Sequence, residues 1–514
     1  MSNTRRNFIK TVILGTGAVF VDWSDVFAAT FGKSLPVTTN HQHFGTAHEY
    51  LSGTKRLPSQ TRTEKTDYVI VGGGTAGIAA AWRLKKMGKE FLLLENEEHL
   101  GGVMLNPSPA WNGIPCPLGS TYFVRNNGIY GDFLADMNVR PIETGEDAFC
   151  FDEKNIVVDP WNPSNLSQLP LPTADRDAFR EFRDFVLAIP LPTYPLNKAP
   201  KDVIAEYDSL TASEFVGRFN SMLLTQFMDL YSRSVLGAPL NEVNAYSFLS
   251  FYSVEFGDAF NLPCWTLPGG LGSIAAGAER FIRTDHVKTN AAVVRVENTN
   301  GGVTVTSVDR LTGEVVEIRA KAAIIAAPKK IARKMVVGLP DDQSKAMGEL
   351  KYAPYITVAL CCNAPLFKTR AFDFWINDTH GRFTDIIDAT SSMDAQAKFH
   401  RTGANAYMVS APRPAGSFAT MDEPAMDKYL AALAQEIAEA VVENVPDARG
   451  KIEELHVFGW TNSMVVPTVG SYQRLAPIIA RSHGNIHFAH SDNDIAPGWE
   501  SAVWHGDQLA RTIS

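Results

Sequence analysis

A cluster of glycines between two short apolar runs carries the clearest chemical signal in the chain. Gly72, Gly74 and Gly77 form the pattern G-x-G-x-x-G directly after the apolar run 68–71, and a helical stretch then leads to a second apolar run, 91–94. The first glycine permits a tight turn, the second lets backbone N–H groups approach a pyrophosphate, and the third lets a helix pack closely on a strand. The N-terminus of such a helix adds partial positive charge beneath the phosphates. The pattern therefore predicts a dinucleotide site at the end of a buried strand.

An acidic residue and a second glycine pair extend this pattern. Glu95 closes the second apolar run, about 20 residues beyond the glycines, where dinucleotide folds carry an acid that accepts hydrogen bonds from the adenosine ribose. Gly101 and Gly102 follow a few residues later. This extended motif resembles that of the flavin amine oxidase superfamily, and NAD-binding folds do not need it. The resemblance implies that the dinucleotide is FAD.

Later segments resemble the same superfamily in the same order. Gly119 stands where the family lets the backbone pass close to the isoalloxazine, and Val293 lies in a strand whose backbone would meet the adenine. Asp492 stands at the acid that holds the ribityl chain and pyrophosphate, and Glu500 aligns with the acid that opens the terminal helix. The amino end of that helix would stabilise negative charge on the reduced flavin.

Three residues would form the substrate side of the flavin in such a family member. Thr357 stands where many amine oxidases carry a lysine that holds a water against flavin N5. Tyr472 matches one ring of the family's aromatic cage, and Trp499 lies one residue from the position of the second ring. Ser471 occupies the position at which some relatives bind the flavin through cysteine. The resemblance therefore implies noncovalent FAD.

The N-terminus has the pattern of an export signal. Arg5 and Arg6 are followed by Phe8 and Lys10, then by a mostly apolar run over 11–21 and small residues at 28–29. This pattern is typical of a twin-arginine signal, which moves folded, cofactor-loaded proteins through the twin-arginine translocase. We expect the protein to reach the periplasm without stable membrane insertion, since no other segment approaches the roughly 18 apolar residues of a membrane span.

These segments predict an α/β fold in which two domains are interleaved along the chain. A Rossmann-like FAD-binding domain of the glutathione-reductase-2 type alternates with an α+β substrate-binding domain. A signal peptide (1–29) and a flexible lead-in (30–65) are expected to precede both domains. The FAD-binding domain is expected to comprise residues 66–139, 257–344 and 456–514. The substrate domain is expected to comprise a helical segment, 140–256, and a second segment, 345–455.

Composition narrows the possible partners. The chain has 514 residues, of which 45% are hydrophobic, so it can bury a large core. Its net charge of −9 and the lack of a basic run beyond the signal argue against nucleic acid. Its five cysteines include no C-x-x-C, and no histidine pair has metal-ligand spacing, so we expect no metal site. The sequence leaves open whether the cysteines form disulfides in an oxidising compartment.

The resemblance implies an oxidoreductase that oxidises a small-molecule amine by hydride transfer to flavin N5. A neutral threonine at position 357 lacks the charge that assists oxygen activation, so a periplasmic cytochrome c or quinone is the expected electron acceptor in preference to oxygen. Two alternatives stay open at this point. One is a carbon–carbon desaturase or isomerase that acts on a polyene or porphyrinogen, and the other is a flavin-binding protein without turnover.

Overall fold

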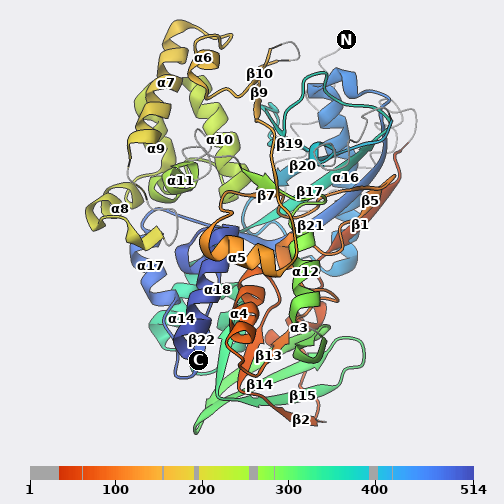
Figure 1. Cartoon of the computed structure of the whole chain (residues 1–514), viewed down its shortest axis with the longest axis vertical. Helices are drawn as coiled ribbons and strands as arrows, with labels where there is room; N and C mark the ends of the chain where they lie inside the picture. Colours follow the sequence, from red (N-terminus) through yellow and green to blue (C-terminus); the bar gives the residue numbers. More distant parts are fainter. Residues whose placement is uncertain are drawn as a thin grey trace.

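The computed structural model describes residues 34–60, 62–152, 155–189, 191, 196–253, 264–282, 284–392, 403–419 and 421–514. The expected signal peptide, 1–29, lies outside the described residues. Figure 1 shows the dinucleotide-binding strands and the meander in the lower half of the view, with the substrate-domain sheet and a group of helices above them.

The glycine pattern lies in a parallel sheet, as predicted. Strand β3 ends at the glycine turn, helix α4 begins at Thr75, and β4 returns beside β3, with Ile70 paired to Leu93. Every residue of β3, β4 and β16 is buried, as expected for strands covered on both faces. The strand order is β12-β4-β3-β16-β22. The elements are β3 (Tyr68–Val71), α4 (Thr75–Lys86), β4 (Phe91–Leu94), β12 (Val287–Lys288), β16 (Ala322–Ile325) and β22 (Ile486–Phe488).

An antiparallel meander crosses this domain. Strands β13 (Ala291–Thr299), β14 (Gly302–Asp309) and β15 (Val315–Ala320) pair in sequence order. Strand β2 (Arg62–Lys65) joins the outer edge parallel to β15. The turn residues Asn300 and Gly301 fall between β13 and β14.

The substrate domain is built on an eight-stranded sheet with the order β1-β21-β17-β20-β19-β18-β9-β10. Its long central strands, β17 and β21, pair antiparallel. Strand β21 carries this sheet to Val466, beyond the boundary expected at 455. The strands are β1 (Val37–His41), β9 (Ala148–Cys150), β10 (Ile156–Val158), β17 (Lys351–Cys362), β18 (Asp373–Ile376), β19 (Asp385–Asp388), β20 (Asn405–Pro412) and β21 (Ile452–Val466).

Helices cover both sides of that sheet. The outer helix is α16 (Glu423–Asn444), which contacts β1 and β21. In the helical insertion, Phe179 and Phe182 of α7 are fully buried at a helical spacing. Thr211 and Glu214 have the sequence spacing of a capping box, and the structure forms it at the start of α9. The helices of the insertion are α6 (Pro163–Leu166), α7 (Thr173–Ala188), α8 (Lys201–Asp208), α9 (Ala212–Val216), α10 (Met222–Leu236) and α11 (Ala245–Tyr252).

The remaining elements connect the two sheets and cover the parallel one. Helix α18 crosses α4 so closely that a Cβ on Gly506 would lie 2.3 Å from the carbonyl oxygen of Ala76. These elements are β5 (Ala110–Trp111), β6 (Ile114–Pro115), β7 (Tyr122–Phe123), α5 (Gly128–Asp136), β8 (Ile142–Glu143), β11 (Trp265–Thr266), α12 (Gly272–Ile282), α13 (Lys329–Met335), α14 (Asp341–Glu349), α17 (Ser471–Ile479) and α18 (Trp499–Ile513). Within the described residues, no helix has the length and apolar content needed to cross a membrane.

The described portion of the lead-in, from residue 34 onward, is folded, which corrects the expectation of a flexible segment. Besides β1 and β2 it contains helix α3 (Gly45–Leu51). The side chain of Gln435 donates to the carbonyl oxygen of Leu35 at 2.7 Å, and Glu423 accepts the N–H groups of Phe44 and Gly45 at 2.9 Å each. The polar composition of this segment gave no sign of these interactions. No local pattern could indicate them either, because each partner lies almost 400 residues away in the sequence.

Candidate active site

The predicted glycines come together at the N-terminus of α4. Gly72 has a φ of +104°, and a Cβ on Gly77 would lie 1.9 Å from the carbonyl oxygen of Gly72. Gly74 is the N-cap of α4 and forms a bridge with Gly101. A Cβ on Gly102 would lie 3.0 Å from the Cα of Gly74. The five glycines thus bring the turn, the first residues of α4 and the segment 101–102 into a contact that side chains would block, and this cradle at the helix N-terminus fits a pyrophosphate.

Glu95 lies at the end of β4 beside this cradle. Its Oε2 accepts the N–H of Gly73 at 2.5 Å and its Oε1 accepts the N–H of Glu97 at 2.8 Å. Burial raises the pKa of Glu95, against the effect of these backbone hydrogen bonds. The backbone of Glu95 accepts the N–H of Ala291, so β13, with the buried Val293, begins close to this carboxylate. The carboxylate therefore orders the glycine turn, and its assignment to the ribose stays a prediction.

Gly119 lies in the loop between the two domains. A Cβ at this position would lie 2.2 Å from the carbonyl oxygen of Val103, so packing within the chain already requires a glycine here. The preceding carbonyl, of Leu118, accepts hydrogen bonds from Thr357 Oγ1 and Trp460 Nε1, each at 2.8 Å. This loop is therefore fixed to β17 and β21 of the substrate domain.

The two later acids are buried and bound to the chain. Asp492 accepts the N–H of Lys329 at 2.9 Å and the hydroxyl of Tyr352, and it lies 3.1 Å from His490. Burial disfavours the ionised carboxylate of Asp492, but the charges of His490 and Lys329 outweigh it and lower its pKa to about 2. His490 thus faces Asp492. The assignment of Asp492 to the ribityl and pyrophosphate stays a prediction.

Glu500 connects the last helix to the strand that precedes the helical insertion. Its Oε1 accepts the N–H of Val124 at 2.7 Å and that of Arg125 at 3.3 Å. The side chain is 5% exposed, and burial raises its pKa. Because these bonds fix the first turn of α18, the amino end of that helix is held against residues 120–124.

A cavity of about 980 Å³, its open mouth included, lies between this backbone and the substrate-domain sheet. One wall is formed by 119–124 and 497–500, which belong to segments that carry the cofactor motifs. The opposite wall is one face of the eight-stranded sheet. Its main side chains come from four neighbouring strands: Tyr355, Thr357, Met408, Ser410, Asp385, Ile387, Asp373 and Trp375.

Strand register explains why these side chains share one face. Ser410 pairs with Thr357 on one side and with Asp385 on the other, and Asp385 pairs with Trp375. Directly paired residues in neighbouring strands point to the same face of a sheet. A single row, Thr357, Ser410, Asp385 and Trp375, therefore crosses the wall. Asp373 lies in the next row, opposite Ile387.

The three predicted substrate-side residues occupy different places. Thr357 and Trp499 line the cavity, and Tyr472 is not among its described lining residues. The Trp499 ring packs 4.9 Å from the ring of Phe123 and 6.1 Å from that of Phe133. Tyr472 is 4% exposed, its ring lies 4.8 Å from that of Tyr246, and its N–H donates to Asp208. A cage role for either ring stays a prediction.

Sequence reasoning missed Asp373 and Asp385. Both carboxylates are almost completely buried, at 3% and 1% exposure, within strands whose other residues are largely apolar. A charged residue inside such a strand was the available signal, since carboxylates are rarely buried without a functional or structural reason. Within the described residues, no group of three or more histidine, cysteine or acidic side chains is arranged to hold a metal ion. No disulfide links the five cysteines, all of which are described.

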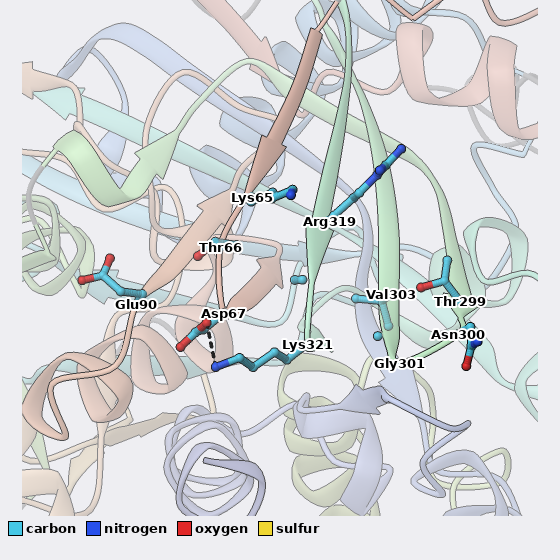
Figure 2. A pocket seen from close by; sticks show the side chains of 12 residues that line it. Lys65, Thr66, Asp67, Glu90, Thr299, Asn300, Gly301, Val303, Arg319 and Lys321 are labelled. Atoms are coloured by element: carbon cyan, nitrogen blue, oxygen red, sulfur yellow. Dashed lines mark ion pairs between the residues drawn. The ribbon is translucent and has the colours of Figure 1, made fainter.

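A second hollow lies far from this cavity, at the edge of the meander. Figure 2 shows its charged side chains, which include Lys65, Glu90 and Arg319, and the ion pair of 2.9 Å between Asp67 and Lys321. The hollow is open to solvent and mixes both signs of charge, so water and salt screen these groups. It offers none of the cofactor motifs.

The family comparison agrees with this geometry. The model of the family described as flavin containing amine oxidoreductase matches residues 75–512. The chain belongs to this family. The match spans both walls of the cavity, the meander and the C-terminal segments that resembled the family, so the predicted superfamily is confirmed.

Individual relatives are distant. An L-amino-acid oxidase from Demansia vestigiata is 24% identical over 324 residues, which cover 58% of this chain and 58% of that protein. An FAD-dependent oxidoreductase, dbaF, from Emericella nidulans is 28% identical over 191 residues, 37% of this chain and 38% of that one. The chain thus aligns with only a fraction of the length of these curated relatives.

Solved structures share the fold over nearly their whole length. Putrescine oxidase bound to putrescine has a TM-score of 0.68 at 16% identity, covering 88% of this chain and 99% of its own. Cyclohexylamine oxidase from Brevibacterium oxydans has a TM-score of 0.65 at 17% identity, covering 87% and 98%. These likenesses confirm the expected α/β fold with a dinucleotide-binding and a substrate domain.

The family and the glycine cradle together identify FAD as the cofactor and the protein as an FAD-dependent oxidoreductase. The residues present fit the group, because the glycines keep the N-terminus of α4 clear of side chains, as a pyrophosphate requires, and the acid Glu95 lies beside them. Ser471 is 1% exposed at the position where some relatives carry cysteine, and it cannot form a thioether. A thioether at this position is excluded, which agrees with the expected noncovalent FAD.

Proposed function

We propose that the protein oxidises a small amine at the carbon attached to nitrogen. The observation that supports this most directly is the cavity between the cofactor-motif backbone and the sheet wall. When bound, FAD supplies the hydride acceptor, at N5 of its ring. The chain supplies flat aromatic surfaces and an environment that excludes bulk water, which orient the amine and its reacting C–H bond.

The nitrogen must be neutral when its neighbouring carbon loses hydride, because the lone pair develops into the new C=N bond. The carboxylates Asp373 and Asp385 would stabilise an ammonium ion beside them. The reacting amine is therefore best accommodated at the opposite wall, near 119–124 and 497–500. Glu500 lies on that wall, but its Oε1 already accepts two backbone N–H groups.

The carbon–carbon desaturase alternative fits this cavity less well. A polyene would place hydrocarbon against the two buried carboxylates, Asp373 and Asp385, without offering them hydrogen bonds. Such desolvation of polar groups is costly. The presence of this cavity argues against the second alternative, a flavin-binding protein without turnover.

Anaerobic mixing of the purified, FAD-loaded protein with amines and polyenes tests this proposal. We expect amines to bleach the oxidised flavin absorbance and polyenes to leave it unchanged. Bleaching by a polyene alone would replace amine oxidation with desaturation, and bleaching by neither class would contradict catalysis on these substrates.

We also propose that the enzyme works in the periplasm after export by the twin-arginine translocase. Arg5 and Arg6 in their sequence context support export, and folded export suits a protein that acquires FAD in the cytoplasm. Thr357, which is neutral and already donates to Leu118, supports slow reaction with oxygen. A cytochrome c or a quinone is the proposed electron acceptor.

A further inference from the structure

The described lead-in joins the two domains. Its strand β1 pairs with β21 in the substrate-domain sheet, and helix α3 contacts β13 of the meander (Figure 1). Tyr50 and Leu51 of α3 pack against a small apolar cluster of the meander. That cluster consists of Val294, Val308 and Val315. Residues 41–51, the strap, therefore run from one domain to the other.

On the substrate-domain side, Glu423 of α16 holds the strap. Its Oε1 accepts the N–H groups of Phe44 and Gly45 at 2.9 Å each. Burial disfavours the ionised carboxylate of Glu423, but these backbone hydrogen bonds and the charges of His43 and His41 outweigh it and lower its pKa. The first residues of the strap are thus fixed to α16.

On the FAD-binding side, Glu97 holds the strap. Its Oε1 accepts the backbone N–H of His43 at 3.0 Å, and its Oε2 is hydrogen-bonded to His43 Nδ1 at 2.7 Å. The side-chain amide of Asn96 donates to the carbonyl oxygen of His43 at 2.6 Å. Both Asn96 and Glu97 directly follow Glu95, the acid predicted to bind the ribose, and the N–H of Glu97 donates to Glu95 Oε1 at 2.8 Å. The strap therefore fixes the residue whose backbone fixes Glu95.

A carboxylate binds a ligand more tightly when it is already held in the bound orientation, because less ordering is needed on binding. We propose that the strap, through His43 and Glu97, positions Glu95 and thereby slows the release of FAD. The inference rests on the predicted ribose contact of Glu95 and not on the oxidation of an amine. Retention matters for the proposed export with bound cofactor, since FAD lost after translocation would have to be replaced outside the cytoplasm.

Release of FAD from the oxidised holoprotein, without substrate, tests the inference. The holoprotein is diluted into buffer that contains phosphodiesterase, which cleaves released FAD to the more fluorescent FMN and prevents rebinding. His43→Ala removes the side-chain hydrogen bond to Glu97 and should increase the rate constant of FAD release by about 2- to 10-fold, the range for one hydrogen bond. His48→Ala makes the same change at an exposed residue of α3 and should leave the rate constant unchanged.

Two further variants distinguish positioning from a general loss of stability. His43→Asn places an amide N–H where Nδ1 stood, so the rate constant should return to within about twofold of the wild type. Glu97→Ala should accelerate release at least as much as His43→Ala does. The double variant should be no faster than Glu97→Ala, because both changes remove the same interaction. The melting temperature of each apoprotein identifies a folding defect.

Each result has a distinct meaning. Faster release in His43→Ala that His43→Asn reverses supports the inference. Unchanged release in both His43→Ala and Glu97→Ala overturns it, and so does an equal acceleration by His48→Ala. Failure of His43→Asn to reverse the effect, or additive effects of the two alanine changes, also overturns it, because His43 would then act by another route. These outcomes are independent of the proposed amine oxidation, since no substrate is present.

Discussion

The hydroxyl group of Thr357 donates a hydrogen bond of 2.8 Å to the carbonyl oxygen of Leu118. This bond joins the central strand of the substrate domain to the loop that carries Gly119. It also occupies the hydroxyl group, so Thr357 contributes a neutral, already bonded side chain to the cavity. In relatives with a lysine at this position, a positive charge would occupy the same space.

Thr357→Lys should therefore accelerate reoxidation of the reduced enzyme by oxygen. A cation in a low-dielectric site stabilises the superoxide formed by the first electron transfer, and we expect a rate increase of about tenfold or more. Stopped-flow mixing of substrate-reduced enzyme with aerated buffer measures this rate, compared with reoxidation by cytochrome c or a quinone analogue. Thr357→Val, which removes the hydrogen bond without adding charge, is the control. Wild-type reoxidation by oxygen as fast as turnover would contradict the proposed acceptor.

Glu95→Ala should weaken FAD binding by a few kcal/mol, on the order of two charge-assisted hydrogen bonds. The loss combines the ribose contacts with disorder of the turn at Gly73, whose N–H the carboxylate accepts. Flavin fluorescence during titration of apoprotein gives the dissociation constant. Glu98→Ala, an exposed acid nearby, should leave it unchanged. Acid precipitation of the wild type should release all flavin as free FAD, and flavin left in the pellet would contradict noncovalent binding.

Replacement of both Arg5 and Arg6 with lysine should retain the protein in the cytoplasm with FAD still bound. Twin-arginine export depends on the arginine pair itself, and lysine preserves only the charge. Cell fractionation followed by a flavin assay of each fraction measures the outcome. Undiminished periplasmic delivery of the double variant would exclude this export route.

Asp147→Asn should make stability less sensitive to pH. Burial raises the pKa of Asp147 from 3.8 to about 7, although the hydrogen bond from Trp375 opposes the shift. Between about pH 4 and 7 the native state therefore binds a proton that the unfolded state releases, so stability falls as pH rises through that window. The wild type should lose about 1 to 4 kcal/mol across it relative to the variant. Melting temperatures from pH 5 to pH 8 test this, and a parallel decline in both proteins would refute it.

Local patterns predicted the regions of the fold in which neighbours in sequence are neighbours in space. The glycine turn after β3 and the capping box of Thr211 and Glu214 depend on a few consecutive residues, and the structure has both. The meander follows from alternation and short turns. Family resemblance added Gly119, Thr357 and Trp499, all of which line the cavity.

Features that depend on pairing between segments distant in the sequence could not be predicted in this way. The row of Thr357, Ser410, Asp385 and Trp375 depends on the register of four strands, and no local pattern fixes which strand lies beside which. The same holds for Leu35 and Gln435, whose hydrogen bond closes the edge of the sheet. A carboxylate in an apolar strand could be noticed in the sequence, but its orientation toward the cavity could not.

The position of β1 has a consequence for biosynthesis. This strand leaves the ribosome long before its partner β21, which pairs parallel to it with Val37 opposite Leu455. The edge of the substrate-domain sheet therefore stays open until β21 has been synthesised, and contacts of such large sequence separation form slowly. During that interval β1 and the edge of β17 that β21 later covers are exposed to mispairing with other chains. Synthesis of β21, and not the early appearance of the nucleotide-binding motif, is thus the event that allows this half of the molecule to close.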